Sequence, residues 1–199
     1  SFNSAFVPSY ASELSKGKSQ ANNFANDIYN FLVISLFSLV LLIEIFMPYF
    51  VFLIAPGFSG DEEKMQLVIN LTRITFPFLF FISISSFFSA ILNSHNRFAA
   101  AAAAPIILNI VLISSLIISF YYNLDYAKQL SYGVTIAGML QLIFLSYVSL
   151  KYYKPNFSLN FKITKRIKFF FKKLLPSVLS SGITQINILI GTIIASFQG

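Results

Sequence analysis

Long apolar stretches alternate with short polar segments along the whole chain. Five stretches of 19 to 27 residues carry at most one charged side chain each: residues 28–54, 69–92, 104–122, 131–150 and 174–197. A helix needs about 20 apolar residues to cross a hydrocarbon core roughly 30 Å thick. Because backbone groups in lipid must form their hydrogen bonds internally, each stretch is predicted to be a transmembrane helix. The stretch 28–54 is longer than one crossing of the membrane requires, so the helix is expected to tilt or to break near Pro48.

The charged residues between these stretches predict the orientation of the helices. Residues 151–173 hold eight basic side chains and no acidic one, whereas residues 55–68 hold three acidic side chains and one lysine. Basic loops stay in the cytoplasm, so residues 151–173 are expected there. Counting helices backwards then places residues 93–103 and 1–27 in the cytoplasm. Residues 55–68 and 123–130 are expected outside.

The composition agrees with a membrane protein. Hydrophobic residues make up 56% of the 199 positions and charged residues 11%, against about 25% charged in an ordinary soluble domain. We therefore expect an all-α, polytopic helix bundle that forms one transmembrane domain over residues 1–199. Residues 1–14 are interpreted as the end of an earlier helix, which makes the chain part of a longer protein.

Catalysis is not expected from this sequence. It has no cysteine and one histidine, His95, so it offers neither a thiolate nucleophile nor a cluster of histidines for a metal. It also lacks an HExxH motif, a phosphate-binding glycine loop and a pair of carboxylates within one span. We expect no enzyme activity, no metal and no cofactor.

Two charged side chains stand inside predicted spans. Glu44 lies in the first and Arg73 near the start of the second, both towards the outer side. A buried carboxylate costs about 2.5–3.5 kcal/mol on insertion scales, so such residues mark functional sites or find partners. One interpretation is an ion pair that acts as an external gate. The other is that Arg73 extends to the membrane surface while Glu44 finds a local partner.

The last predicted span carries a polar stripe. Its members recur at nearly helical spacing and are Ser177, Ser181, Thr184, Thr192 and Ser196, and Gln185 borders them. Such a stripe faces the interior of a bundle, either as the wall of a substrate cavity or as ordinary packing of small residues. If it lines a cavity, replacing Ser181 and Thr184 with leucine should impair transport without preventing membrane insertion.

The basic segment 155–173 mixes lysines with bulky apolar residues. It is predicted to lie on the inner leaflet and to contact anionic lipid headgroups through Lys162, Lys165, Arg166, Lys168, Lys172 and Lys173. The alternative is that these charges only set topology. Nucleic acid is not expected as a partner, because the segment is tethered between two spans.

The predicted cytoplasmic turn near residue 95 carries a second polar group. Asn93, Asn96 and Arg97 are expected to cap a helix end and to contact headgroups, and His95 is expected to be solvated.

Seven motifs occur in order along nearly the whole chain: Phe2–Leu14 (FNSAFVPSYASEL), Ala55–Phe58 (APGF), Arg73–Pro77 (RITFP), Ala90–Phe98 (AILNSHNRF), Ala104–Asn109 (APIILN), Leu140–Gln141 and Gln185–Phe197 (QINILIGTIIASF). Together they resemble the MurJ (MviN) family of bacterial lipid II flippases, within the multidrug/oligosaccharidyl-lipid/polysaccharide exporter superfamily. This sequence differs from the family's usual residues at three places: Glu44, His95 and the run Ala99–Ala103.

That resemblance implies a fold and an activity. The family has roughly fourteen helices in two lobes that work by alternating access, and this chain would run from the end of helix 2 to helix 7. It would help to move lipid II, an undecaprenyl-pyrophosphate-linked disaccharide-peptide, across the bacterial cytoplasmic (inner) membrane for cell-wall synthesis. Cell-wall synthesis proteins are possible partners. The family's essential cavity arginines lie mainly in helices 1 and 8, outside this chain.

Two other functions stay open at this point. The first is export of another lipid-linked oligosaccharide or of a drug by a relative within the superfamily. The second is a membrane scaffold that transports nothing. Arginines in the missing helices would favour a pyrophosphate lipid, whereas buried carboxylates there would favour a cation-coupled drug exporter.

Overall fold

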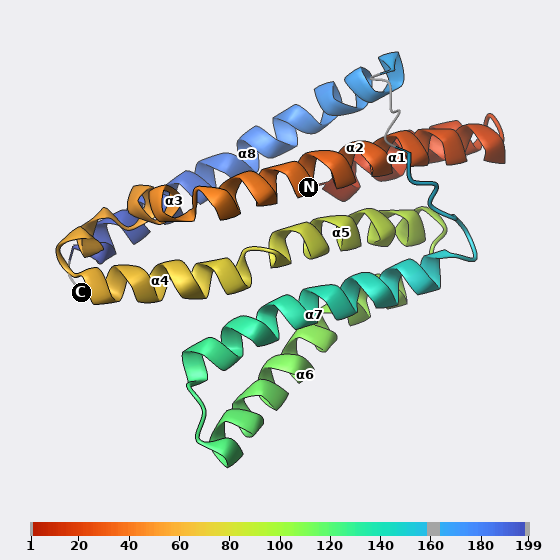
Figure 1. Ribbon diagram of the computed structural model, residues 1–199. Coiled ribbons are helices and arrows are strands. Elements are labelled where there is room, and N and C mark those ends of the chain that lie inside the picture. Colours follow the sequence, from red (N-terminus) through yellow and green to blue (C-terminus); the bar gives the residue numbers. More distant parts are fainter. Residues whose placement is uncertain (1, 159–163, 198–199) are drawn as a thin grey trace.

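A computed structural model describes residues 2–158 and 164–197, and every regular element in them is helical (Figure 1). The elements in chain order are α1 (Phe2–Leu14), α2 (Lys18–Ile45), α3 (Met47–Ile54), the short 3-10 helix η1 (Pro56–Gly60), α4 (Glu62–Thr75), α5 (Phe78–Ser94), α6 (Phe98–Tyr122), α7 (Tyr126–Ser149) and α8 (Lys165–Ser196).

The helices run back and forth between two ends of the bundle. Residues 15–17, 95–97 and 150–158 lie at one end in Figure 1, and residues 55–61 and 123–125 lie at the other. We call the first the inner end, because it carries the basic connections, and the second the outer end. Towards the outer end, the α6–α7 hairpin diverges from the layer formed by α2, α3 and α8.

Four helical segments in the described residues are long and apolar enough to cross a membrane. They are Lys18–Ile45, Glu62–Ser94, Phe98–Tyr122 and Tyr126–Ser149. The predicted span 174–197 lies in the second part of α8, which contains the shorter apolar stretch Gln185–Ser196. These helices confirm the predicted class, an all-α bundle that crosses a membrane several times.

The first apolar stretch is divided rather than continuous. α2 ends at Ile45, and Phe46 separates it from α3, whose first turn contains Pro48. Proline has no N–H and suits the first turn of a helix, so the chain restarts there instead of continuing. The short α3 then reaches the outer end.

An aromatic core fills the inner half of the bundle. The rings of Phe2, Tyr10, Phe24, Phe87 and Phe170 surround the buried ring of Phe6, with centroids 5.3–6.2 Å from it. These six residues, which we call the inner aromatic cluster, come from α1, α2, α5 and α8. Aromatic pairs at such distances add to the energy of simple burial.

The outer half has a much smaller core. Met47 and Val51 of α3 pack with Ile69 of α4, and Phe50 and Phe76 cover them from one side. The helices of this half therefore share less buried apolar surface.

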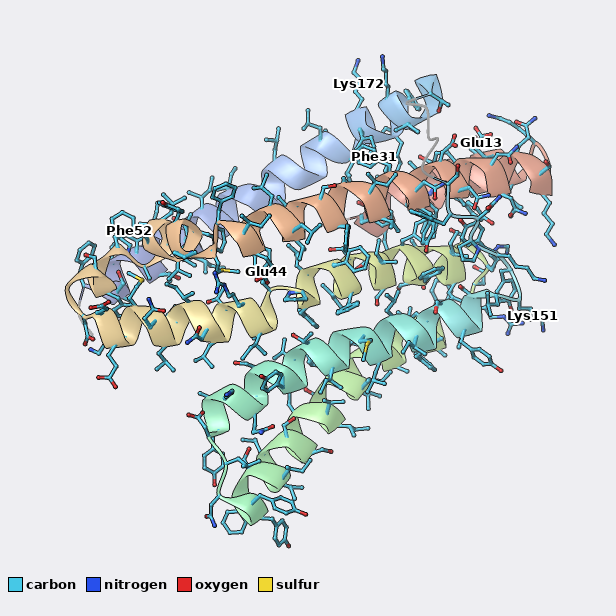
Figure 2. The ribbon with its side chains drawn as sticks, in the orientation of Figure 1. Glu13, Phe31, Glu44, Phe52, Lys151 and Lys172 are labelled. Atoms are coloured by element: carbon cyan, nitrogen blue, oxygen red, sulfur yellow. The ribbon has the colours of Figure 1, made fainter. Side chains whose placement is uncertain are left out.

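The sequence predicted that the basic segment 155–173 lies on the inner leaflet, but its second half is not a separate surface helix. Residues 165–173 are the first turns of α8, which continues through Pro176 without a break. Ile167 and Phe170 are buried in the inner core, and this burial anchors the start of α8 on its neighbours. Lys168, Lys172 and Lys173 stay exposed, and Figure 2 shows Lys172 pointing away from the bundle. Lys162 lies outside the described residues, as do the side chains of Lys165 and Arg166.

Candidate functional site

The second predicted span is interrupted in its first half, within the RITFP motif. α4 ends at Thr75 and α5 begins at Phe78, on either side of Phe76 and Pro77. Because Pro77 has no N–H, the carbonyl of Arg73 loses its usual helical donor. The hydroxyl of Thr135 in α7 donates a hydrogen bond to the carbonyl of Ile74, so a neighbouring helix satisfies part of the break.

A polar cavity of about 480 Å³ lies beside this break, between α4 and the start of α7. Its lining residues are Leu67, Asn70, Leu71, Arg73, Ile74, Asp125, Lys128 and Tyr132. Arg73 and Lys128 contribute positive charge to its wall. The Asp125 carboxylate accepts a hydrogen bond from the Lys128 backbone N–H at 2.8 Å and caps α7. We call this space the outer cavity.

Glu44 and Arg73 lie within electrostatic range of each other. The positive charge of Arg73 acts on the Glu44 carboxylate. Within the described residues the two side chains form no ion pair, and the buried Oε1 of Glu44 accepts no hydrogen bond. Figure 2 shows Glu44 between the ribbons of α2 and α4. The structure thus places a half-buried carboxylate, with one unbonded oxygen, within electrostatic range of the arginine at the helix break.

The polar stripe of α8 is described only in part. Gln185 and Thr192 are exposed, and Thr192 Oγ1 donates to the carbonyl of Ile188 in its own helix at 3.0 Å. The side chains of Ser177, Ser181 and Thr184 lie outside the described residues. The substrate-cavity role of the stripe therefore stays a prediction.

α8 meets the outer end of the bundle through a very close backbone approach. The Gly57 N–H of the APGF motif donates to Ser196 Oγ at 3.0 Å. A Cβ added at Gly57 would lie 2.2 Å from the Ser196 carbonyl oxygen. Glycine is therefore the residue that lets η1 touch the end of α8.

The predicted cytoplasmic turn does cap a helix. Asn96 adopts the left-handed conformation (φ 58°), and the Arg97 N–H donates to the Leu92 carbonyl at 2.9 Å. The Asn96 N–H donates to the Asn93 carbonyl, which completes a Schellman motif at the end of α5. Arg97 Nε also donates to the Tyr152 hydroxyl at 2.7 Å, so this cation is held against the end of α7.

His95 is not the solvated loop residue that the sequence suggested. Its ring stacks on Tyr152 at 4.7 Å, and its Nε2 lies 3.4 Å from the Tyr10 hydroxyl. Burial lowers the pKa of His95, and the positive charge of Lys18 adds to that effect. The imidazole is therefore kept neutral over a wider pH range than in water.

The connection between α7 and α8 is bonded to α2 by contacts that the sequence analysis missed. The Tyr153 hydroxyl donates to Asn26 Oδ1 at 2.5 Å, and the Asn156 N–H donates to the same oxygen at 3.1 Å. One turn later, Asn30 Nδ2 donates to the Asn156 carbonyl and Asn30 Oδ1 accepts from the Ser158 N–H. The spacing of the two asparagines by four residues places them on one face of α2, and this was the available signal.

The chain matches known proteins over its whole length. The sequence profile of the family described as "Lipid II flippase MurJ" matches residues 1–198. A probable lipid II flippase MurJ of Rhizobium tropici is 37% identical over 98% of this chain, and one of Rickettsia prowazekii is 36% identical over 98%. The chain spans about 38% of the length of each of these relatives.

The fold also has a counterpart among solved structures. A structure titled "Lipid II flippase MurJ, inward closed conformation" aligns with a TM-score of 0.73 at 23% sequence identity. The alignment covers 100% of this chain and 42% of the other. The fold of the nine described elements therefore recurs in about two fifths of that larger protein.

Proposed function

Because the chain belongs to the lipid II flippase MurJ family, we propose that it forms part of a protein that moves lipid II from the inner to the outer leaflet. Family membership and the apolar helices point to a multi-pass protein of the bacterial inner membrane. The activity that the family's description names is transport and not catalysis. The match over residues 1–198 is the observation that carries this proposal.

The broken span supports the proposal on physical grounds. A pyrophosphate headgroup loses its hydration inside a membrane, and a polar cavity with positive side chains can replace part of it. Arg73 and Lys128 provide such charges at the wall of the outer cavity. Interrupted spanning helices are also where transporters of other folds bind their substrates.

We further propose that Arg73 and Glu44 take part in opening the outer side. Glu44 has an unsatisfied carboxylate oxygen, and Arg73 lies within electrostatic range of it without forming an ion pair. A small shift of α2 against α4 would bring the charges together or separate them further. Such a pair would favour one of the two arrangements and could be displaced by an anionic headgroup.

The exposed lysines at the start of α8 have a proposed role as well. Lys168, Lys172 and Lys173 lie at the inner end, where anionic lipids of the inner leaflet attract basic side chains by roughly 1 kcal/mol each. We propose that they hold this end of α8 at the headgroup level.

The first experiment tests the activity of the full-length protein. Cells depleted of their own flippase would receive the complete gene, and lipid II exposed at the outer leaflet would be measured together with growth. Restored exposure supports the proposal. Correctly inserted protein with no restored exposure would contradict it and would favour another lipid-linked substrate.

A second experiment tests the charged pair in the same cells. Arg73→Ala should reduce lipid II exposure strongly, and Arg73→Lys should retain most of it if positive charge is what matters. Lys64→Ala is the matched control, because Lys64 is another cation of α4 but lies at its exposed start. If Glu44 and Arg73 act together, the loss in the Glu44→Gln/Arg73→Gln double variant should be smaller than the sum of the single losses.

A further inference from the structure

A second, smaller cavity lies among α5, α6 and α7, away from the outer cavity. Its volume is about 140 Å³, and its walls carry an unusual number of hydrogen-bonding groups for the interior of apolar helices. α5 supplies Ser85, Ser86 and Ser89, and α7 supplies Gln141. We call this space the serine cavity.

Most of these polar side chains form no side-chain hydrogen bond with the described residues. Ser85 is 1% exposed and its Oγ has no hydrogen bond to any described residue. Gln141 is 2% exposed, and its side chain forms no hydrogen bond with a described residue. Within the described residues, only Ser86 among the four uses its side chain in a hydrogen bond, from Oγ to the Ile82 carbonyl at 3.0 Å.

Pro105 removes the usual helical donor to one backbone carbonyl of α6. Pro105 lies inside α6 and lines the serine cavity together with Ala101. The carbonyl of Ala101 would normally bond to the N–H of residue 105, which proline lacks. The cavity thus joins hydroxyl oxygens, an amide and a backbone carbonyl without its usual i+4 donor, from three helices.

This set of groups fits one class of ligand. Buried polar groups without partners are satisfied by bound water or by a ligand that carries the missing charge. Neutral hydroxyl, amide and carbonyl oxygens coordinate a monovalent cation, as backbone carbonyls released from helices do in transporters. The described walls hold no carboxylate, which divalent Mg²⁺ and Ca²⁺ sites generally use.

We propose that the serine cavity is a binding site for a monovalent cation, with Na⁺ coordinated by Ser85, Ser89, Gln141 and the Ala101 carbonyl. The site is separate from the charged residues of the outer cavity and does not depend on the proposed transport activity. By joining α5, α6 and α7, a bound ion would stabilise their packing against one another.

The test uses the purified full-length protein in nanodiscs of neutral lipid. Thermal unfolding would be followed by circular dichroism while NaCl replaces choline chloride at constant ionic strength, with MgCl2 as a separate arm. Because a ligand of the native state raises the melting temperature, we expect a saturable increase with Na⁺. No saturable increase, or one seen with Mg²⁺ alone, would overturn the proposal and leave water as the occupant.

Variants decide whether the effect belongs to this cavity. Ser85→Ala combined with Gln141→Leu should abolish the Na⁺-dependent increase, and its persistence would overturn the proposal. Ser114→Ala is the matched control, because Ser114 is an exposed serine of α6 whose Oγ donates to the Ile110 carbonyl.

One further variant keeps the test decisive if the double variant does not fold. Gln141→Glu places a carboxylate in the cavity, and its negative charge should lower the Na⁺ concentration for half-saturation by about tenfold at pH 8. An unchanged half-saturation concentration in a folded Gln141→Glu protein would contradict the proposed position of the ion.

Discussion

At the inner end of the bundle, four helices share one aromatic core, and the α7–α8 connection is bonded to α2 through Asn26 and Asn30. At the outer end, the shared core consists of Met47, Val51 and Ile69, and α4 and α7 enclose a polar cavity instead of packed side chains. The two ends draw their cores from different helices, and they differ in how many side chains hold those helices together.

The difference suggests which end can move. Rings and side-chain amides that interlock have few alternative arrangements, because close-packed cores deform little. Helices joined by a small core and a cavity can change their spacing at lower cost. We therefore expect the outer ends of α4 and α7 to shift while the inner ends keep their contacts.

The largest effect on the difference between the two ends is expected when the central ring of the inner aromatic cluster is removed. Phe6→Ala should cost about 3–5 kcal/mol of unfolding free energy, because it leaves a cavity among five rings. The measurement is unfolding of the purified full-length protein in detergent. Phe120→Ala is the control, since Phe120 is 70% exposed and should change little. Equal losses of unfolding free energy in both variants would contradict the proposal that the inner core contributes more to stability.

The next largest effect concerns the backbone approach between η1 and α8. Gly57→Ala should cost about 1–3 kcal/mol, because its Cβ would overlap the Ser196 backbone. Gly60→Ala, three residues away, should be nearly neutral, since its Cβ would meet no atom within 4 Å. The same unfolding assay measures both. If Gly57→Ala and Gly60→Ala lose the same unfolding free energy, the contact with η1 does not hold the end of α8.

The hydrogen bonds at the inner end give a smaller effect. Tyr153→Phe should cost about 1 kcal/mol or slightly more, because the buried hydroxyl no longer donates to Asn26. Burial, with smaller effects of Tyr29 and Tyr10, raises the pKa of Tyr153, so this hydroxyl stays protonated as a donor. Tyr147→Phe is the control, since Tyr147 is exposed. A difference below the error of the assay would contradict the proposed role of this contact.

A bond at the helix break tests the outer half in a similar way. Thr135→Val should cost about 1 kcal/mol, because the Ile74 carbonyl loses its donor from α7. Thr75→Val removes a hydroxyl that bonds only within α4, to Leu71 and Thr72, and should cost less. Hydrogen exchange near residues 74–78 should rise in the first variant alone. Similar exchange in both would mean that α7 does not stabilise the break.

The smallest expected effect is a pH dependence at the inner end. The pKa of His95 is lowered in the folded protein, whereas in the unfolded chain it is about 6.5. As pH falls, His95 is therefore protonated at a higher pH in the unfolded chain than in the folded protein. The stability from neutral His95 is thus complete above about pH 6.5 and is lost as pH falls through the folded-state pKa. Unfolding should become easier over that range, and His95→Phe should reduce the slope. An unchanged slope would contradict the assignment to His95.

Local patterns predicted much of the fold. The apolar stretches predicted the spanning segments, because lipid offers backbone groups no partner other than their own helix. The asparagine at position 96 predicted a helix cap, since the left-handed conformation favours that residue. Proline positions indicated the interruption near Pro48, but the break at Pro77 was not anticipated within a stretch of strongly apolar residues.

The candidate site was less accessible to sequence reasoning. Glu44 and Arg73 could be selected because charges are costly inside a membrane. The structure places Glu44 within the electrostatic range of Arg73, and their role as a gate stays a prediction. The serine cavity was missed, because single serines on an apolar helix commonly bond to their own backbone, as Ser86 does. Its unpartnered groups become visible only when α5, α6 and α7 are brought together.

The sequence by itself determined the class of the protein, most of its long apolar segments and the end that carries the basic charge, because hydrocarbon thickness and membrane charge act on local composition. Only the tertiary structure decided which distant residues contact each other. The contacts of Tyr153 with Asn26, Gly57 with Ser196 and Thr135 with Ile74 join residues 127, 139 and 61 positions apart. No helical period extends over such separations, so these partners depend on how whole helices pack, which short apolar patterns leave open.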